Sequence, residues 1–322
     1  MKRIGVLTSG GDSPGMNAAI RAVVRAAIYK GLEVWGIMRG FAGLIEGQFE
    51  KMNLLSVGNI IQRGGTILKS ARSEEFKTPT GRKIAAQRLK EFLIDALVVI
   101  GGDGSFKGAW ELSQEWGIKV IGIPGTIDND LYGTDYTIGY DTAANTAMQC
   151  IDKIRDTAFS HERIFFVEVM GRASGFIALE AGIAGGAEEI LIPETKTNLK
   201  KLWKKLKAGM DRGKLTNIIL VAEGDEAGGA LQVAKKIKEL SGIDYRVTIL
   251  GHIQRGGCPS VYDRILASKL GVRAIECLLQ GKYNVMVGEV GRKLVETPLN
   301  LTWEKKKKLD PSLQELIKIL AS

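Results

Sequence analysis

Two carboxylates and a hydroxyl lie close together in the stretch Pro124–Asp130, which reads PGTIDND. Asp128 and Asp130 flank Asn129, and Thr126 precedes them. Two carboxylates spaced two residues apart on a loop can divide the work of a proton transfer, one accepting the proton and the other orienting it. The alternative is an Asn/Asp-rich turn whose side chains cap a helix. The heptapeptide alone leaves both interpretations open.

The residues before this stretch indicate the element that positions it. Val120, Ile121 and Ile123 read as a buried strand, which Pro124 and Gly125 bring to an end. Polar residues at the carboxyl end of a parallel strand are where open α/β sheets bind ligands. We therefore expect a ligand-binding edge here.

Apolar strand-like runs alternate with stretches of helical periodicity along most of the chain. Ile20, Val23 and Val24, for example, lie on one helix face that ends at Gly31. This alternation predicts an α/β fold with parallel sheets and right-handed crossovers. Strands are expected at 3–8, 33–38, 96–100, 119–123, 164–169, 189–192, 217–221 and 246–250.

Two glycine-rich loops each follow a predicted strand and precede a predicted helix, GGDSPG at 10–15 and GGDGS at 101–105. Glycine lets backbone N–H groups approach a phosphate, and the helix N-terminus adds its dipole. Neither loop contains GxxxxGK[ST], which excludes a P-loop NTPase. Asp103 would repel the pyrophosphate of a dinucleotide, but it suits a Mg²⁺ ion between itself and bound phosphates. A purely structural strand–turn–helix is the alternative for each loop taken singly.

Length and composition set the class of protein. With 322 residues, two domains are expected, and 45% hydrophobic and 25% charged residues are typical of a globular enzyme. Cys150, Cys258 and Cys277 are widely spaced, so we predict no disulfide or cysteine metal site and a reducing, cytoplasmic location. The first apolar run is too short for a signal peptide or a membrane span.

The net charge of +9 requires nucleic-acid binding to be considered. Much of the excess lies in the runs Lys200–Lys207 and Glu304–Lys308, which we expect to be solvated faces of amphipathic helices. No zinc-finger spacing, basic zipper or aromatic RNA-binding signature accompanies them. We predict small anionic ligands and no nucleic-acid or membrane partner.

Taken together, the motifs resemble those of the ATP-dependent 6-phosphofructokinases of bacterial type. The resemblance rests on LTSGGDSPGMNAAIR (7–21), RGGT and SAR (within 63–72), VVIGGDGS (98–105), PGTIDND (124–130), KIRDT (153–157), VEVMGR (167–172), AGGAE (184–188), VAEG (221–224), GHIQRGG (251–257) and DRILAS (263–268). It implies two Rossmann-like three-layer domains with mainly parallel sheets and the active site in the cleft between them. An ATP-binding domain would comprise 1–139 and 253–304, and a fructose-6-phosphate-binding domain 140–252 and 305–322.

The resemblance also implies the reaction, in which the γ-phosphoryl of MgATP passes to the 1-hydroxyl of fructose 6-phosphate in glycolysis. Asp128 would accept the proton of that hydroxyl, and the catalytic group would be Gly11, Arg72, Thr126, Asp128, Asp130 and Arg172. ATP would be bound by Gly11, Arg72, Ser73, Gly102, Asp103, Gly104 and Ser105, with Asp103 holding Mg²⁺ directly or through water. Such a reaction needs mostly positioning and charge stabilisation.

The sugar phosphate would be bound, by the same resemblance, by Thr126, Ile127, Asp128, Met170, Gly171, Arg172, Glu223, His252 and Arg255. Arg163 and Arg246 would reach in from a neighbouring subunit, which implies a homo-oligomer, a tetramer in this family. His161, the other histidine, is expected to be structural.

Two further comparisons concern the phosphoryl donor and regulation. Pyrophosphate-using relatives carry bulkier residues where this chain has Gly104 and Gly125, so ATP is the expected donor. The residues that match the family site for the effectors ADP and phosphoenolpyruvate are Arg21, Arg25, Arg155, Gly186, Glu188, Arg212 and Lys214.

Some positions depart from the family pattern. Leu54 replaces an effector-binding arginine and Asn59 an aspartate, which predicts a weak or altered effector response. Phe176 and the 285–299 segment are expected to change affinity before activity. A pyrophosphate-dependent enzyme and a non-catalytic nucleotide-sensing relative are the alternatives.

Overall fold

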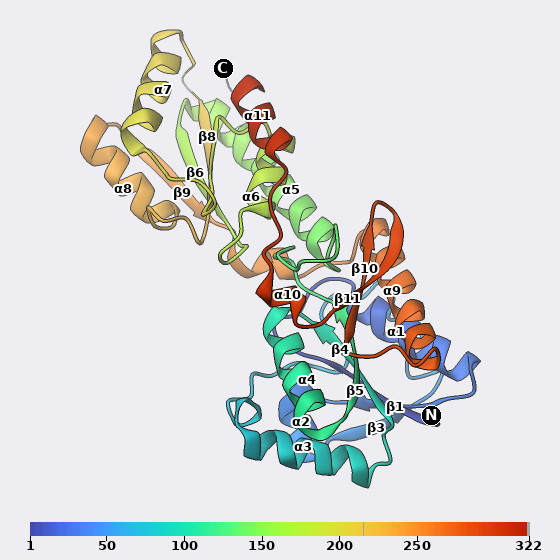
Figure 1. Cartoon of the computed structure of the whole chain (residues 1–322). Coiled ribbons are helices and arrows are strands. Elements are labelled where there is room, and N and C mark those ends of the chain that lie inside the picture. Colours follow the sequence, from blue (N-terminus) through green and yellow to red (C-terminus); the bar gives the residue numbers. More distant parts are fainter. Residues whose placement is uncertain (215, 321–322) are drawn as a thin grey trace. The chain divides into compact units, whose positions relative to one another are not determined.

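The computed structural model describes residues 1–214 and 216–320, which form two compact α/β units (Figure 1). The first unit comprises Met1–Ile127, Leu131–Thr142 and Arg255–Lys307. The second comprises Asp128–Asp130, Ala143–Gln254 and Lys308–Ser322, of which we describe the residues up to 320. Neither unit is one continuous stretch of chain, because the sequence returns to the first unit late.

The first unit is built on a 7-stranded sheet in the order β11-β10-β5-β4-β1-β2-β3. The antiparallel pairs, β2 with β3 and β10 with β11, lie at its two edges, and the strands between are parallel. Its strands are β1 (Arg3–Thr8), β2 (Glu33–Ile37), β3 (Phe49–Met52), β4 (Ala96–Gly101), β5 (Lys119–Pro124), β10 (Val285–Val290) and β11 (Lys293–Pro298).

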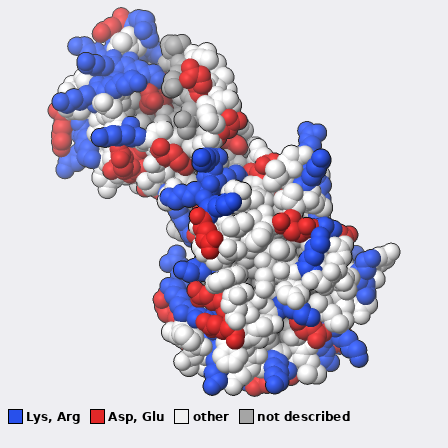
Figure 2. Space-filling model, in the orientation of Figure 1, with Lys and Arg blue, Asp and Glu red and all other residues white. Residues whose placement is uncertain are grey.

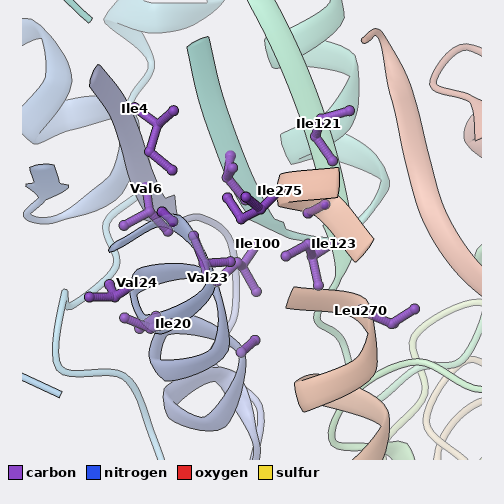
Figure 3. Packing of buried hydrophobic residues seen from close by; sticks show 14 of the residues in the cluster. Ile4, Val6, Ile20, Val23, Val24, Ile100, Ile121, Ile123, Leu270 and Ile275 are labelled. Carbon is purple, nitrogen blue, oxygen red and sulfur yellow. The ribbon is translucent and has the colours of Figure 1, made fainter. Parts of the chain in front are cut away.

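Both faces of this sheet are covered by helices, because alternate strand residues point to opposite sides. On one face, Val98 and Ile121 join a core with α1 (Met16–Tyr29) and α9 (Val261–Leu279), seen in Figure 3. On the other, Val99 and Val120 join a core with the remaining helices of the unit. These are α2 (Gly40–Glu46), α3 (Pro79–Glu91), α4 (Asp103–Trp116) and α10 (Leu301–Glu304), with the 3-10 turn Glu75–Lys77 beside them.

The second unit has a 4-stranded, all-parallel sheet in the order β7-β8-β6-β9. Its strands are β6 (Ile164–Val169), β7 (Glu189–Leu191), β8 (Asn217–Ala222) and β9 (Tyr245–Ile249). The core on one face is formed with α7 (Leu199–Asp211) and α8 (Ala230–Ser241). Helix α6 (Phe176–Ala184) packs on β7 and β8, and α11 (Pro311–Leu320) packs on α6. The long helix α5 (Tyr140–His161) begins in the first unit and continues in the second.

The eight predicted strands are all confirmed, each within about a residue of its expected ends. Strands β3, β10 and β11 were not predicted. The last two form a hairpin whose turn residues, Gly291 and Arg292, both have positive φ, of 55° and 65°. Such a two-residue turn matches the twist of paired strands.

The two basic runs differ in structure. The run at 200–207 lies in α7, where Leu202 and Leu206 are buried and Lys204 is exposed, so its prediction is confirmed. Lysines and arginines gather on this unit around α7 and α8 (Figure 2). The prediction that 304–308 continues a helix is wrong, because α10 ends at Glu304 and Lys306 pairs with Leu131 in an isolated β-bridge.

Among the described residues no helix is long and apolar enough to cross a membrane.

Candidate active site

Three loops meet at the carboxyl ends of β5, β4 and β1, which are neighbours in the first unit's sheet. Past the end of β1, Ser9 N donates to Ile100 O at 3.0 Å, and past the end of β5, Gly125 N donates to Gly101 O at 3.0 Å. The three strands therefore end level with one another. This is the edge at which parallel sheets bind ligands.

The glycines of these loops are required by close packing. A Cβ on Gly101 would lie 2.6 Å from Ser9 O and 2.7 Å from Ser105 Oγ. Gly10 has a φ of +86°, and a Cβ there would lie 3.3 Å from the same serine oxygen. Only a residue without a side chain allows backbones to approach this closely. The loops after β1 and β4 are thus in direct contact.

The N-terminus of α4 is open to solvent. Gly102 is its N-cap residue and has no side chain to bond the first amides, and Asp103 and Gly104 are exposed. A Cβ on Gly104 would meet nothing within 4 Å. The N-terminus of a 14-residue helix, with its dipole and no side-chain cap, is the kind of place where proteins bind anions.

A metal ion at this helix end would need ligands from a bound substrate in addition to those of the protein. Within 1–214 and 216–320 no three His, Cys, Asp or Glu side chains are grouped to hold a metal. Asp103 is an exposed carboxylate whose Oδ1 accepts the N–H of Gly104 at 2.7 Å. Mg²⁺ is commonly held by one or two carboxylates, with water and substrate phosphates as its other ligands. Asp103 fits that pattern.

The segment that carries Arg72 and Ser73 begins beside the first glycine loop. Ser70 Oγ donates to Gly10 O at 2.6 Å, and Thr8 Oγ1 donates to Lys69 O at 2.8 Å. Arg72 itself is exposed. These bonds attach the start of the segment to β1 and its loop.

Arg255, predicted to bind the sugar phosphate, belongs to the first unit. Its Nη1 donates to Asp12 O at 3.0 Å. A Cβ on Gly11 would lie 2.5 Å from that same nitrogen. The guanidinium therefore lies against the first glycine loop.

The PGTIDND stretch passes from the first unit to the second. Thr126 is buried in the first, where its carbonyl accepts from Thr137 Oγ1 at 2.6 Å. Asp128 belongs to the second, where it is only 2% exposed and one carboxylate oxygen lies 3.4 Å from Arg172 Nε. Asn129 has a φ of 51°, so the chain turns sharply just after this carboxylate.

Arg172 is held against Asp128 by an unusual turn at the carboxyl end of β6. Gly171 and Arg172 both have positive φ, of 145° and 52°. Glu223 Oε1 accepts both of their N–H groups, at 3.2 and 2.7 Å. A carboxylate facing two consecutive amides stabilises this left-handed turn. The predicted sugar-phosphate residues Met170, Gly171, Arg172 and Glu223 are thereby brought together.

Two buried side chains in this region were missed by sequence reasoning. Gln254 is fully buried, and its Oε1 accepts from Met170 N at 3.4 Å while its Nε2 donates to Gly251 O at 3.1 Å. It thus ties the turn to the segment of exposed His252. Ser174 lies at the other side of the turn, 6% exposed. Gln254 lies inside the GHIQRGG motif, whereas Ser174 lies two residues beyond VEVMGR, and nothing in the sequence marked its role.

Arg163 and Arg246 lie elsewhere on this unit. Arg163 directly precedes β6, and Arg246 is paired with Phe165 near the start of β9. Met170 follows the far end of β6, so the six-residue strand separates it from Arg163 by about 20 Å. The two arginines are exposed at the opposite end of the sheet from the turn.

The predicted effector residues are divided between the units. Gly186, Glu188 and Lys214 line one pocket of the second unit, and Lys214 Nζ lies 3.0 Å from Glu188 Oε1. Arg155 donates to the carbonyl of Gly186 at 2.7 Å, and Arg212 follows α7. Arg21 and Arg25 lie on α1 in the first unit.

Sequence comparison decides the family. The phosphofructokinase family model matches residues 3–278. An ATP-dependent 6-phosphofructokinase of Halothermothrix orenii is 58% identical over 331 aligned positions that cover 100% of both chains. ATP-dependent 6-phosphofructokinase 1 of Thermus thermophilus is 56% identical over 321 positions, again 100% of each. The chain belongs to the phosphofructokinase family.

Solved structures of phosphofructokinases share its fold. The phosphofructokinase of Saccharomyces cerevisiae matches with a TM-score of 0.90 and 39% identity. The match covers 100% of this chain and 48% of the yeast chain, so this chain spans about half of the yeast one. A pyrophosphate-dependent phosphofructokinase from Marinobacter aquaeolei matches with a TM-score of 0.85 and 22% identity, a likeness of fold alone. The predicted two-domain α/β fold of this phosphofructokinase family member is confirmed.

Proposed function

We propose that the protein transfers the γ-phosphoryl group of MgATP to the 1-hydroxyl of fructose 6-phosphate, giving fructose 1,6-bisphosphate and ADP. The observation that carries this proposal is the buried carboxylate of Asp128, held 3.4 Å from Arg172 Nε. Asp128 lies four residues beyond the end of β5, in whose sheet β4 and β1 each precede a glycine loop. Relatives named ATP-dependent 6-phosphofructokinase that match the whole chain support the same reaction.

The first unit would bind the nucleotide. Gly11 and the amides of 102–105 would receive the phosphates at the open end of α4, with Arg72 and Ser73 beside them. The empty space in front of Gly104 leaves room for the α-phosphate that ATP has and pyrophosphate lacks. A Mg²⁺ ion at Asp103 would neutralise charge on the β- and γ-phosphates.

The chemistry would then be shared among four side chains. Asp128 would accept the proton of the sugar hydroxyl as its oxygen attacks the γ-phosphorus. Thr126 and Asp130 would keep the acceptor and the transferred group in line. Arg172 has two roles in this scheme, because it orients Asp128 and supplies positive charge for the phosphoryl oxygens.

The second unit would bind fructose 6-phosphate through the Met170–Arg172 turn, Glu223 and His252. Arg163 and Arg246 are remote from that turn within one chain. We therefore infer that they complete the sugar-phosphate site of a neighbouring subunit, which requires a homo-oligomer; we propose a tetramer. This interpretation gives a function to two exposed arginines that the chain's own turn does not use.

ADP and phosphoenolpyruvate are the effectors we propose for the pocket at Gly186, Glu188 and Lys214. In the proposed oligomer the effector site is shared between subunits, and Arg21 and Arg25 from α1 of a neighbouring subunit would supply further positive charge for the phosphates. Leu54 is 46% exposed and provides no charge, which favours a weak response.

A spectrophotometric assay coupled to product formation tests the reaction, with fructose 6-phosphate, Mg²⁺ and either ATP or pyrophosphate. We expect turnover with ATP alone. Asp128→Asn should lower kcat by roughly 10²–10⁴ while the protein stays folded, the effect of removing a general base. Asp225→Asn is a matched control, because Asp225 is a 5%-exposed aspartate of the same unit that we place outside the site. Turnover with pyrophosphate alone, or full activity of Asp128→Asn, would refute the proposal.

A further inference from the structure

Ser174 connects the turn of the second unit to the backbone of Asp128. Its Oγ lies 2.8 Å from the carbonyl of Asp128 and 2.8 Å from the carbonyl of Gly171. The side chain is only 6% exposed, so water competes little for these bonds. The two carbonyls are 46 and three residues distant from the serine in sequence, which makes the first contact a tertiary one.

One of these carbonyls is in Asp128 and the other is in the residue before Arg172, so they lie in the backbone at the two partners of one ion pair. Gly171 immediately precedes Arg172, whose Nε lies 3.4 Å from the Asp128 carboxylate. A single hydroxyl thus contacts the backbone that carries the base and the backbone that carries its arginine. The hydroxyl has one hydrogen, which the two carbonyls share, so its position constrains the separation of those two backbones and with it the geometry of the pair.

The fold of the turn does not depend on this hydroxyl. Ser174 N donates to Gly171 O at 2.9 Å, and Gly175 N donates to Glu194 Oε1 at 2.8 Å. Glu223 holds the amides of Gly171 and Arg172. Removing the Oγ therefore leaves the turn closed but removes its hydrogen bond to the Asp128 carbonyl, so that the ion pair loses a backbone constraint.

We propose that Ser174 is a positioning residue for phosphoryl transfer, which fixes the Asp128 carboxylate relative to Arg172 by sharing its one hydroxyl hydrogen between the carbonyls of Asp128 and Gly171. This inference rests on the proposed function, because it assumes that Asp128 is the general base. The hydroxyl itself touches no reacting atom in this scheme.

The first test compares Ser174→Ala with Ser174→Thr, which keeps the hydroxyl. One buried hydrogen bond corresponds to a loss of about three- to tenfold in kcat for Ser174→Ala. We expect the KM for ATP to stay within about twofold, because the first unit's loops are unchanged. Ser174→Thr should recover most of the lost kcat.

Ser113→Ala is the matched control. Ser113 is also 6% exposed, and its Oγ donates to Asn284 Oδ1 at 2.7 Å in the first unit, within α4. It should lose comparable thermal stability without the loss of kcat. Equal kcat values for the two alanine variants would overturn the proposal.

A double-mutant cycle with Arg172→Ala separates positioning from a general structural effect. If Ser174 acts through the pair, Ser174→Ala should change kcat less than about twofold once Arg172 is absent. The full three- to tenfold loss in that background would mean that Ser174 acts independently of the pair, contrary to the inference. An inactive wild-type protein would instead show that the proposed function has failed, so the two failures are distinguishable.

Discussion

Gly104 offers a substitution that should separate nucleotide binding from stability. It is the second residue of α4, its φ is not positive, and a Cβ there meets nothing within 4 Å. Gly104→Asp therefore introduces no clash. Replacing a helical glycine relieves an entropic cost of roughly 0.5–1 kcal/mol. A carboxylate in the first turn also interacts favourably with the helix dipole, by roughly 0.3–1 kcal/mol. Repulsion from Asp103 offsets part of this gain, so the variant should be at least as stable as the wild type.

The same substitution should weaken ATP binding although it does not lower stability. The new carboxylate would extend into the space that we assign to the α-phosphate. Two unit charges about 5 Å apart at an effective dielectric constant of about 20–40 repel by about 2–3 kcal/mol. The KM for ATP should therefore rise about 30- to 150-fold while the melting temperature stays the same or increases.

Steady-state kinetics with varied ATP, together with thermal unfolding, provide the test. Gly104→Ala is the control, since it adds a methyl group without charge and should change the KM for ATP by less than about threefold. A Gly104→Asp enzyme with an ATP KM within threefold of wild type would refute the placement of the nucleotide at this helix end.

Three further predictions concern other parts of the molecule. Glu223→Gln keeps an oxygen for the Gly171 and Arg172 amides but removes the charge. The KM for fructose 6-phosphate should therefore rise about 10- to 100-fold. The KM for ATP, measured in the same kinetic assay, should stay unchanged. Leu54→Arg adds a cation at an exposed position and should lower the phosphoenolpyruvate concentration for a half-maximal change in activity about tenfold or more. An unchanged response curve would count against the effector assignment. Burial raises the pKa of Asp263 to about 6, above its ordinary value of 3.8, so the folded state binds the proton more tightly than the unfolded state. The free energy of unfolding should therefore fall by roughly 1 kcal/mol between pH 5 and pH 7, and urea titrations should show this slope reduced in Asp263→Asn.

Much of the fold was predictable because its strands are apolar runs. Residues 96–100 and 217–221 are continuous apolar or nearly apolar stretches, which is what a strand buried on both faces requires. Strand β3 reads FEKM, and its two central residues are charged because it lies at a sheet edge. No periodicity distinguishes four such residues from a loop. The hairpin of β10 and β11 was hidden by its turn, since Gly291-Arg292 is not one of the common hairpin pairs.

Residues of the candidate site could be predicted from the sequence where the residue type itself indicates a chemical role. Asp103 and Asp128 carry charge, and the glycine loops are recognisable by composition. Ser174 and Gln254 act through partners that are 46 and 84 residues away in the sequence. A serine in a loop and a glutamine in a polar stretch have many uses, so only the fold reveals which carbonyls and amides they meet. The bond between Arg255 and Asp12 O is of the same kind, 243 residues apart.

The late return of the chain to the first unit bears on how the protein is made. Helix α9 covers α1, and β10 pairs with β5, yet both segments are synthesised after residues 143–254 of the second unit. Until residues 255–307 leave the ribosome, the apolar face of α1 and one edge of the sheet lack their covering. The nascent first unit is therefore an incomplete intermediate for most of translation, exposed to aggregation and to proteases. A chain truncated at residue 254 should fail to form a stable first unit, although it contains five of the unit's seven strands.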